Sequence, residues 1–248
     1  LTKSSQNSND AGDNFCQLFL ARESRNMTKT ATGPIVVINP NSNTHVTNGL
    51  VEALHGFKHA GGPKIECLTL AEGPFGIQSQ VDSDSVVIPL VELVSARPDA
   101  GAFVIACYSD PGLDACRSVS AVPVFGIQDS GVLTAMARAD CFGVIAIAEA
   151  SILRHRRTMA RMGVLGRLVG EIALNMTVDE SARGPKTFSK LVGTGNALRE
   201  RGAGAVILGC AGMACHRTKL ESEIGIPVID PTQAAVAMAF GTLVTATG

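Results

Sequence analysis

Short hydrophobic runs alternate with longer segments of helical periodicity from residue 34 onward. The runs predict strands at residues 35–38, 64–70, 102–106, 124–126, 142–147, 205–208 and 228–229. The intervening segments predict helices at residues 44–59, 84–95, 113–119, 131–138, 152–162, 189–201 and 233–244. Strands that alternate with helices, and that are apolar throughout, are typical of parallel sheets covered by helices on both faces.

The chain also contains an internal repeat. Residues 97–107 and 201–210 each run from a Gly-Ala segment through an apolar strand to a cysteine, Cys107 or Cys210. The repeat predicts an α/β fold of two similar Rossmann-like lobes, related by a pseudo-twofold axis, with the active site between them. We expect the lobe with Cys107 to comprise residues 34–128 plus 230–248, and the lobe with Cys210 to comprise residues 129–229.

Composition narrows the function classes. The net charge is -1 and the chain has one Tyr and no Trp, which argues against nucleic acid as a partner. No apolar run approaches the roughly 20 residues of a membrane span. The chain has seven cysteines, an odd number, which argues against a disulfide framework. We therefore expect a cytoplasmic protein with a small-molecule substrate, preceded by a polar, disordered extension at residues 1–33.

The positions of Cys107 and Cys210 suggest chemistry. Each follows a buried strand, and ligands of open parallel sheets bind at the carboxyl ends of the strands. Two thiols facing one cleft could remove a proton from one face of a carbon and deliver one to the other, exchanging roles for the two enantiomers. We expect backbone N–H groups and helix N-termini after each cysteine to lower its thiol pKa.

Other interpretations of these residues are open at this point. Both cysteines could be structural, in a protein that only binds a small molecule. One could be the nucleophile of a hydrolase with His216 as its base. Cys210, Cys215 and His216 could hold zinc, although their spacing lacks the usual Cys-x2-Cys pair. Residues 154–157, Arg-His-Arg-Arg, are predicted to form a solvated basic helix face.

Several short segments, taken in this order and spacing, resemble the Asp/Glu racemase superfamily, and within it the hydantoin and allantoin racemases. They are residues 37–42 (Val-Ile-Asn-Pro-Asn-Ser), 72–74 (Glu-Gly-Pro), 106–114 (Ala-Cys-Tyr-Ser-Asp-Pro-Gly-Leu-Asp), 123–127 (Pro-Val-Phe-Gly-Ile), 208–213 (Leu-Gly-Cys-Ala-Gly-Met) and 227–230 (Pro-Val-Ile-Asp). The resemblance implies a two-lobed α/β fold, no cofactor and no metal, a homo-oligomer, and Cys107 and Cys210 as the acid/base pair.

The residues after each cysteine favour a subgroup. At the corresponding positions, glutamate and aspartate racemases have sequences like Cys-Asn-Thr and Cys-Thr-His. This chain has Cys-Tyr-Ser at 107–109 and Cys-Ala-Gly at 210–212. Ala and Gly offer only backbone N–H groups, which suit the carbonyl of a neutral ring such as a hydantoin. An amino-acid racemase, a maleate isomerase or an arylmalonate decarboxylase remains the alternative. The expected substrate-binding residues are Asn41, Ser42, Pro74, Ile77, Tyr108, Gly126, Ile127, Ala211, Gly212 and Met213.

One position departs from the subgroup. Hydantoin racemases usually carry Thr or Ser after the strand that corresponds to residues 142–147, and this chain continues with Ala148. The departure leaves the exact substrate open.

Overall fold

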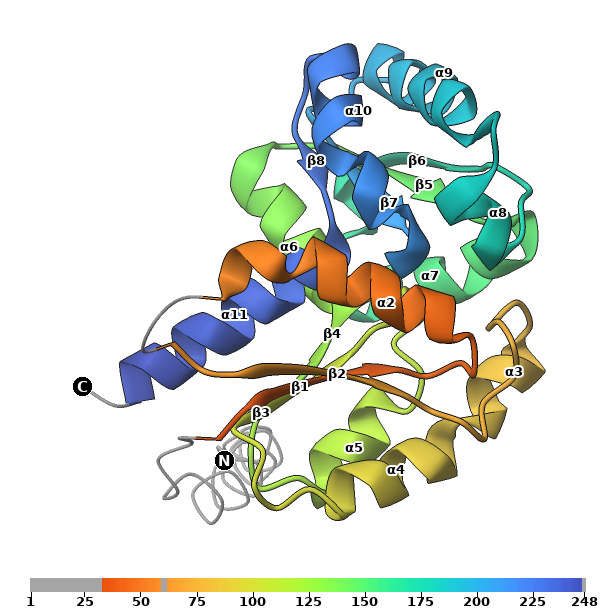
Figure 1. The fold of residues 1–248 in the computed structure, drawn as a ribbon. Helices are drawn as coiled ribbons and strands as arrows, with labels where there is room; N and C mark the ends of the chain where they lie inside the picture. Colours follow the sequence, from red (N-terminus) through yellow and green to blue (C-terminus); the bar gives the residue numbers. More distant parts are fainter. Residues whose placement is uncertain (1–32, 59–61, 247–248) are drawn as a thin grey trace, which may run out of the picture.

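Two four-stranded parallel sheets form the framework of the protein (Figure 1). The computed structural model describes residues 33–58 and 62–246, so the predicted extension at residues 1–33 lies, except for Gly33, outside them. The first sheet has the order β2-β1-β3-β4 and the second the order β6-β5-β7-β8. The strands are β1 (Ile35–Asn39), β2 (Ile65–Thr69), β3 (Ala102–Ile105), β4 (Val124–Gly126), β5 (Phe142–Ala146), β6 (Leu168–Ala173), β7 (Ala205–Gly209) and β8 (Val228–Ile229). The matching orders confirm the predicted α/β fold with two similar sheets.

Helices flank both sheets and connect successive strands. They are α2 (Thr44–Ala53), α3 (Gln80–Ser85), α4 (Val87–Ser95), α5 (Leu113–Val119), α6 (Ile127–Arg138), α7 (Glu149–Arg161), α8 (Val178–Arg183), α9 (Thr187–Glu200), α10 (Arg217–Ile224) and α11 (Pro231–Ala246), with short 3-10 helices η1 (His55–Phe57), η2 (Leu165–Arg167) and η3 (Ala211–His216). In the described residues, no helix is long and apolar enough to span a membrane.

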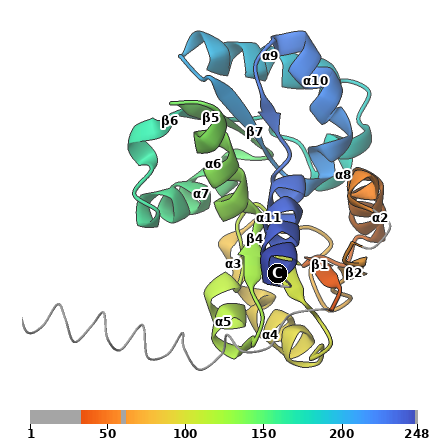
Figure 2. The same cartoon turned by 90° about the vertical axis from the view of Figure 1, so that its left-hand side faces the viewer.

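The core has a shared middle layer and two outer layers. Alternate residues of a strand point to opposite faces of its sheet. Val104 of β3 and Ile207 of β7 therefore pack in the layer between the two sheets, whereas Ile105 and Leu208 pack in separate outer layers. Helix α11 contacts α6 and strands of both sheets, and Figure 2 shows it running between them. This packing fixes one sheet relative to the other.

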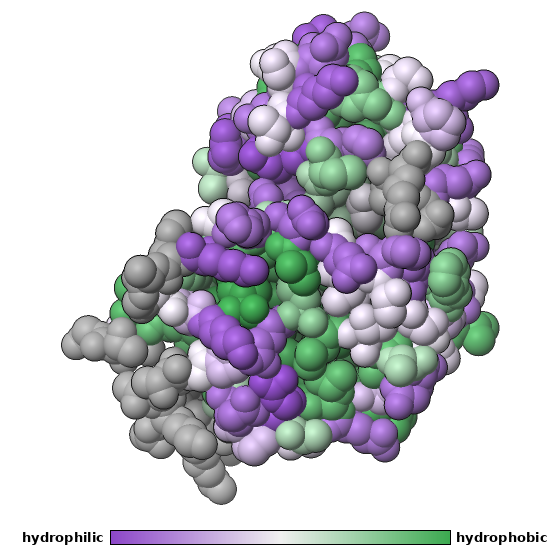
Figure 3. All heavy atoms as spheres, viewed as in Figure 1, coloured by the Kyte–Doolittle hydropathy of each residue, from purple (hydrophilic) through white to green (hydrophobic). Residues whose placement is uncertain are grey.

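The half-buried strand β2 forms one edge of the first sheet. Figure 3 shows hydrophobic side chains on the face of the molecule that carries this strand. Val51 of α2 and Ile88 of α4 are among the exposed large hydrophobic residues. The predicted homo-oligomer stays a prediction.

The sequence missed β6 and the short helices α3, α8 and α10. Strand β6 is half-buried along its whole length and includes Gly170 and Glu171, so it is not a continuous apolar run. Helix α6 begins at Ile127, earlier than expected, and α2 ends at Ala53, where η1 follows. An edge strand and short helices give weak periodic signals because few of their residues are buried.

Helix α7 corrects the prediction of a solvated basic face at residues 154–157. His155 and Arg154 are buried, and only Arg156 and Arg157 are exposed. The Nδ1 atom of His155 contacts Oε1 of Glu171 on β6, and both side chains are at most 2% exposed. The charge pattern of the helix could not reveal this contact, because Glu171 lies on a strand that the sequence did not predict.

The contact between His155 and Glu171 generates a stability prediction. Glu171→Ala removes the only acidic partner that the structure gives His155 within its described residues. Loss of one member of a buried polar pair leaves the other unsatisfied, so the free energy of unfolding should fall by about 3 kcal/mol. Urea denaturation followed by circular dichroism measures this change.

Glu66→Ala is the matched control. Glu66 contacts Lys64 and Arg97 at the surface, both at 2.7 Å, where ion pairs contribute about 0–1 kcal/mol. Equal losses in the two variants would contradict a special contribution from the pair of His155 and Glu171.

Candidate active site

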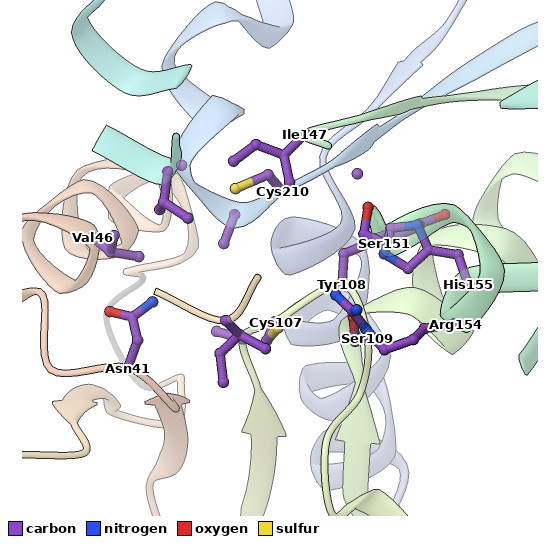
Figure 4. Close-up of a pocket in the computed structure, with 16 residues that line it drawn as sticks. Asn41, Val46, Cys107, Tyr108, Ser109, Ile147, Ser151, Arg154, His155 and Cys210 are labelled. Atoms are coloured by element: carbon purple, nitrogen blue, oxygen red, sulfur yellow. The ribbon is translucent and has the colours of Figure 1, made fainter. Parts of the chain in front are cut away.

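Cys107 and Cys210 occupy corresponding places in the two sheets. Strand β3 lies between β1 and β4, and Cys107 follows it after Ala106. Strand β7 lies between β5 and β8, and Cys210 follows it directly. Both cysteines line a cavity of about 40 Å³, into which they extend from opposite sides (Figure 4). The carboxyl ends of two central parallel strands thus meet at one cavity, where ligands of such sheets bind.

The cavity is lined by residues from both sheets and from the segments that follow their strands. Of the residues expected from the sequence, seven line it: Asn41, Ile77, Cys107, Tyr108, Cys210, Ala211 and Gly212. The sequence did not point to the other nine, which are Val46, Ala106, Ser109, Ile147, Ser151, Arg154, His155, Val178 and Gly209.

Five expected residues lie outside the cavity lining. Ser42 and Pro74 join two loops, because the backbone N–H of Ser42 donates to the carbonyl of Pro74 at 3.0 Å. Ile127 and Met213 are fully buried in hydrophobic clusters. Gly126 makes room for the carboxylate of Asp110: a Cβ at this position would lie 2.3 Å from it.

Asp110 fixes the loop that carries Cys107. Its two carboxylate oxygens accept the backbone N–H groups of Gln128 and Asp129, each at 2.9 Å, in the first turn of α6. The pKa of Asp110 is raised to about 7, mainly by burial and also by the charge of Asp129, against the two N–H groups that its carboxylate accepts. These bonds tie the end of β3 to the helix that follows β4.

The polar turn after β1 places Asn41 in the cavity. Asn43 is the N-cap of α2, since its side chain accepts the N–H of His45 at 3.0 Å. Oδ1 of Asn41 accepts bonds from Asn39 and Asn43, and Figure 4 shows its amide nitrogen turned toward the cavity. Asn41 therefore offers a hydrogen-bond donor to a ligand.

Burial dominates the acidity of both thiols. The pKa of Cys107 is raised to about 12, mainly by burial, and the charges of Cys210 and Asp110 contribute to the rise. The backbone N–H of Ser109 and the charge of Arg154 act in the opposite direction. Burial also raises the pKa of Cys210, against the backbone N–H of Gly212 and the Ser181 hydroxyl. The expected backbone donors are present, but the expectation of lowered pKa values is wrong because desolvation outweighs them.

The structure shows the surroundings of the residues considered for a zinc site and for a hydrolase. Within residues 33–58 and 62–246, no group of three or more His, Cys, Asp or Glu side chains is arranged to hold a metal ion. Nε2 of His216 lies 3.2 Å from the carbonyl oxygen of Ser181, and Oγ of Ser181 lies 3.9 Å from the sulfur of Cys210. The hydroxyl of Ser181 therefore lies beside the sulfur of Cys210.

Sequence and structure comparisons agree on the family. The family model described as Asp/Glu/Hydantoin racemase matches residues 35–239. A hydantoin racemase from Paenarthrobacter aurescens is 32% identical over 216 residues, 83% of this chain and 89% of that protein. A hydantoin racemase from Pseudomonas sp. (strain NS671) is 33% identical over 211 residues, 83% of this chain and 84% of that protein.

A solved structure shares the fold. The allantoin racemase from Klebsiella pneumoniae superposes with a TM-score of 0.80 at 28% identity, covering 86% of this chain and 88% of that one. The residues that the family model matches, 35–239, include both sheets and the segments that carry Cys107 and Cys210. The chain therefore belongs to the Asp/Glu/hydantoin racemase family.

Proposed function

We propose that the protein is a cofactor-independent racemase of a 5-substituted hydantoin or an allantoin-like ring, with Cys107 and Cys210 as its two acid/base residues. The observation that carries the proposal is that these cysteines follow corresponding central strands of the two sheets and line one cavity. The similarity to hydantoin and allantoin racemases supports this substrate class.

The reaction needs one thiolate and one thiol. The thiolate of one cysteine removes the proton from the chiral carbon, and the electron pair of that C–H bond passes into the neighbouring ring carbonyl. The thiol of the other cysteine then protonates the opposite face of the resulting enolate. The two sulfurs exchange protonation states in each turnover, and the opposite enantiomer uses them in the opposite order.

The cavity lining suits a neutral ring. Ile77, Ile147 and Val178 supply apolar contacts, and the amide of Asn41 supplies a donor for a ring carbonyl. The backbone N–H of Gly212 lies beside Cys210, where enolate charge would develop. Exclusion of water strengthens such electrostatic contacts. The same closed, desolvated setting raises the thiol pKa values, so the thiolate formed at neutral pH is scarce and strongly basic.

The substrate must enlarge the cavity. At about 40 Å³, it is smaller than the roughly 300–1,000 Å³ of typical ligand pockets. Binding of a ring between the two cysteines therefore requires the loops after β3 and β7 to separate, and the site to close again before proton transfer.

Cys107→Ser and Cys210→Ser test the two-base mechanism. Each variant should lose racemisation by about 10²–10⁴-fold, because a serine hydroxyl is a far weaker acid/base group. Each should still exchange the α-proton of one enantiomer with deuterium oxide, and the two variants should act on opposite enantiomers. Polarimetry measures inversion, and proton NMR measures exchange.

Cys215→Ser is the control, because Cys215 is exposed and does not line the cavity. Loss of activity in only one of the two cavity variants would favour a hydrolase or a single-base enzyme. Full activity in both would indicate that the thiols are structural.

The raised thiol pKa values predict a pH dependence. Below the pKa of Cys107, which burial raises to about 12, the thiolate fraction increases tenfold with each pH unit. The kcat/KM for racemisation should therefore increase about tenfold from pH 6 to 7 and again from pH 7 to 8. Initial rates by circular dichroism, corrected for the uncatalysed reaction, measure this profile. A plateau that begins below pH 7 would show that a thiolate is already formed there.

A further inference from the structure

Arg154 of α7 is a buried cation beside the two cysteines. Its side chain lines the cavity and is only 8% exposed. Nε lies 3.4 Å from Oγ of Ser109, Nη1 lies 3.3 Å from the carbonyl of Ala150, and Nη2 lies 3.2 Å from the carbonyl of Gln78. Two of these bonds are longer than usual for N–H donors and the third is at the upper end of the usual range, and they use three of the five donors that a guanidinium carries.

No carboxylate of the described residues lies within ion-pair distance of Arg154, although buried charges are ordinarily paired. The charge of Arg154 lowers the pKa of Asp82, but the two groups are farther apart than an ion pair. The Asp82 carboxylate instead accepts the backbone N–H groups of Gln78 and Ser79, at 3.0 and 2.7 Å, before α3. The guanidinium thus retains donors and charge for an external anion.

A second cavity lies behind Arg154. It is a groove open to solvent, of about 630 Å³, and Arg154 and Ser109 are the two residues that line both it and the smaller cavity. The 3.4 Å contact between them is therefore part of the wall that separates the two spaces. Figure 4 shows both side chains close together at one side of the cavity that holds Cys107.

Polar and apolar atoms line the second cavity about equally, and most of its acidic groups have partners. Asp114 contacts Arg161 at 3.3 Å, and Asp129 contacts Arg117 at 3.5 Å. Asp84 accepts a bond from Gln80 at 2.8 Å. Arg157, one turn after Arg154 on α7, also lines this cavity and makes no ion pair within the described part of the chain. Arg154 and Arg157 thus have no ion-pair partner among the described residues, although Asp84, Asp110, Asp114 and Asp129 also line this groove.

The ring of the proposed substrate and its 5-substituent would occupy different parts of the site. The ring belongs between the cysteines, where the site must open to admit it. A 5-substituent that extends past Arg154 and Ser109 would reach the larger space that these two residues also border.

We propose that Arg154 is a specificity-determining residue that binds a carboxylate at the end of a short 5-substituent. The carboxylate replaces the long contact to Ser109 and accepts a bidentate pair of hydrogen bonds from the guanidinium. This inference rests on the proposed ring racemase. It adds a substrate preference to that function, for acidic 5-substituents over neutral or aromatic ones.

A matched pair of substrates tests the inference. One is a hydantoin with a carboxymethyl group at position 5, and the other is the corresponding neutral amide. The wild-type kcat/KM should be at least about tenfold higher for the acid, as expected for a desolvated charge-assisted pair. Arg154→Gln should abolish this preference, mainly by raising KM for the acid. The charge of Arg154 also favours the Cys107 thiolate, so the rate should fall with both substrates, and the ratio of kcat/KM for the acid to that for the amide is the readout.

Arg154→Lys should retain part of the preference, because it keeps the charge but loses the bidentate geometry. Arg156→Gln is the control: Arg156 is exposed on the same helix and lines neither cavity. Equal wild-type rates with acid and amide would overturn the inference without any variant, and so would an equal loss on both substrates in Arg154→Gln. The proposed racemase would survive either result.

If the wild type racemises neither substrate, the proposed function fails, and calorimetric binding of the two compounds judges the inference separately. Tighter binding of the acid that is lost in Arg154→Gln supports a carboxylate site. Equal binding of acid and amide overturns it.

Discussion

Cys107 and Cys210 are buried at the ends of two central strands, and the desolvation of these thiols shapes the rest of the site. Removal from water disfavours the thiolate, so burial raises both pKa values. The scarce thiolate that forms is a stronger base than an exposed one. Burial also places the sulfurs at one small cavity, where the charge state of one influences the other. The titrations of the two thiols are therefore coupled.

The surrounding structure holds this pair in place through buried polar contacts. Asp110 ties the loop after Cys107 to the start of α6, and the absent side chain of Gly126 leaves room for its carboxylate. His155 holds α7 against β6 through Glu171, and its ring packs edge-on against Tyr108 at 4.9 Å. Burial also raises the pKa of Tyr108, so its hydroxyl stays neutral in the cavity lining. Rigid supports of this kind keep reacting groups in position.

The sequence predicted the central features for a clear physical reason. Strands buried on both faces are continuous apolar runs, and the repeated run-plus-cysteine pattern marks equivalent strand ends without any knowledge of packing. Arg154 was assigned to a solvated face because local charge spacing carries no information about which sheet covers the helix. Applying the strand-end rule to β5 as well, which α7 follows, would have pointed to this arginine. The thiol pKa values were expected in the wrong direction because desolvation depends on tertiary packing.

The central claim is that two different sulfurs serve opposite faces of one carbon. Single-enantiomer substrate and wild-type protein in deuterium oxide test it most directly, with mass spectrometry of both enantiomers at low conversion. The two-base account predicts that the product carries deuterium at the chiral carbon while the recovered substrate still carries hydrogen. Equal deuterium in product and recovered substrate, or a product that keeps the original hydrogen, would indicate one base acting on both faces and would contradict the account.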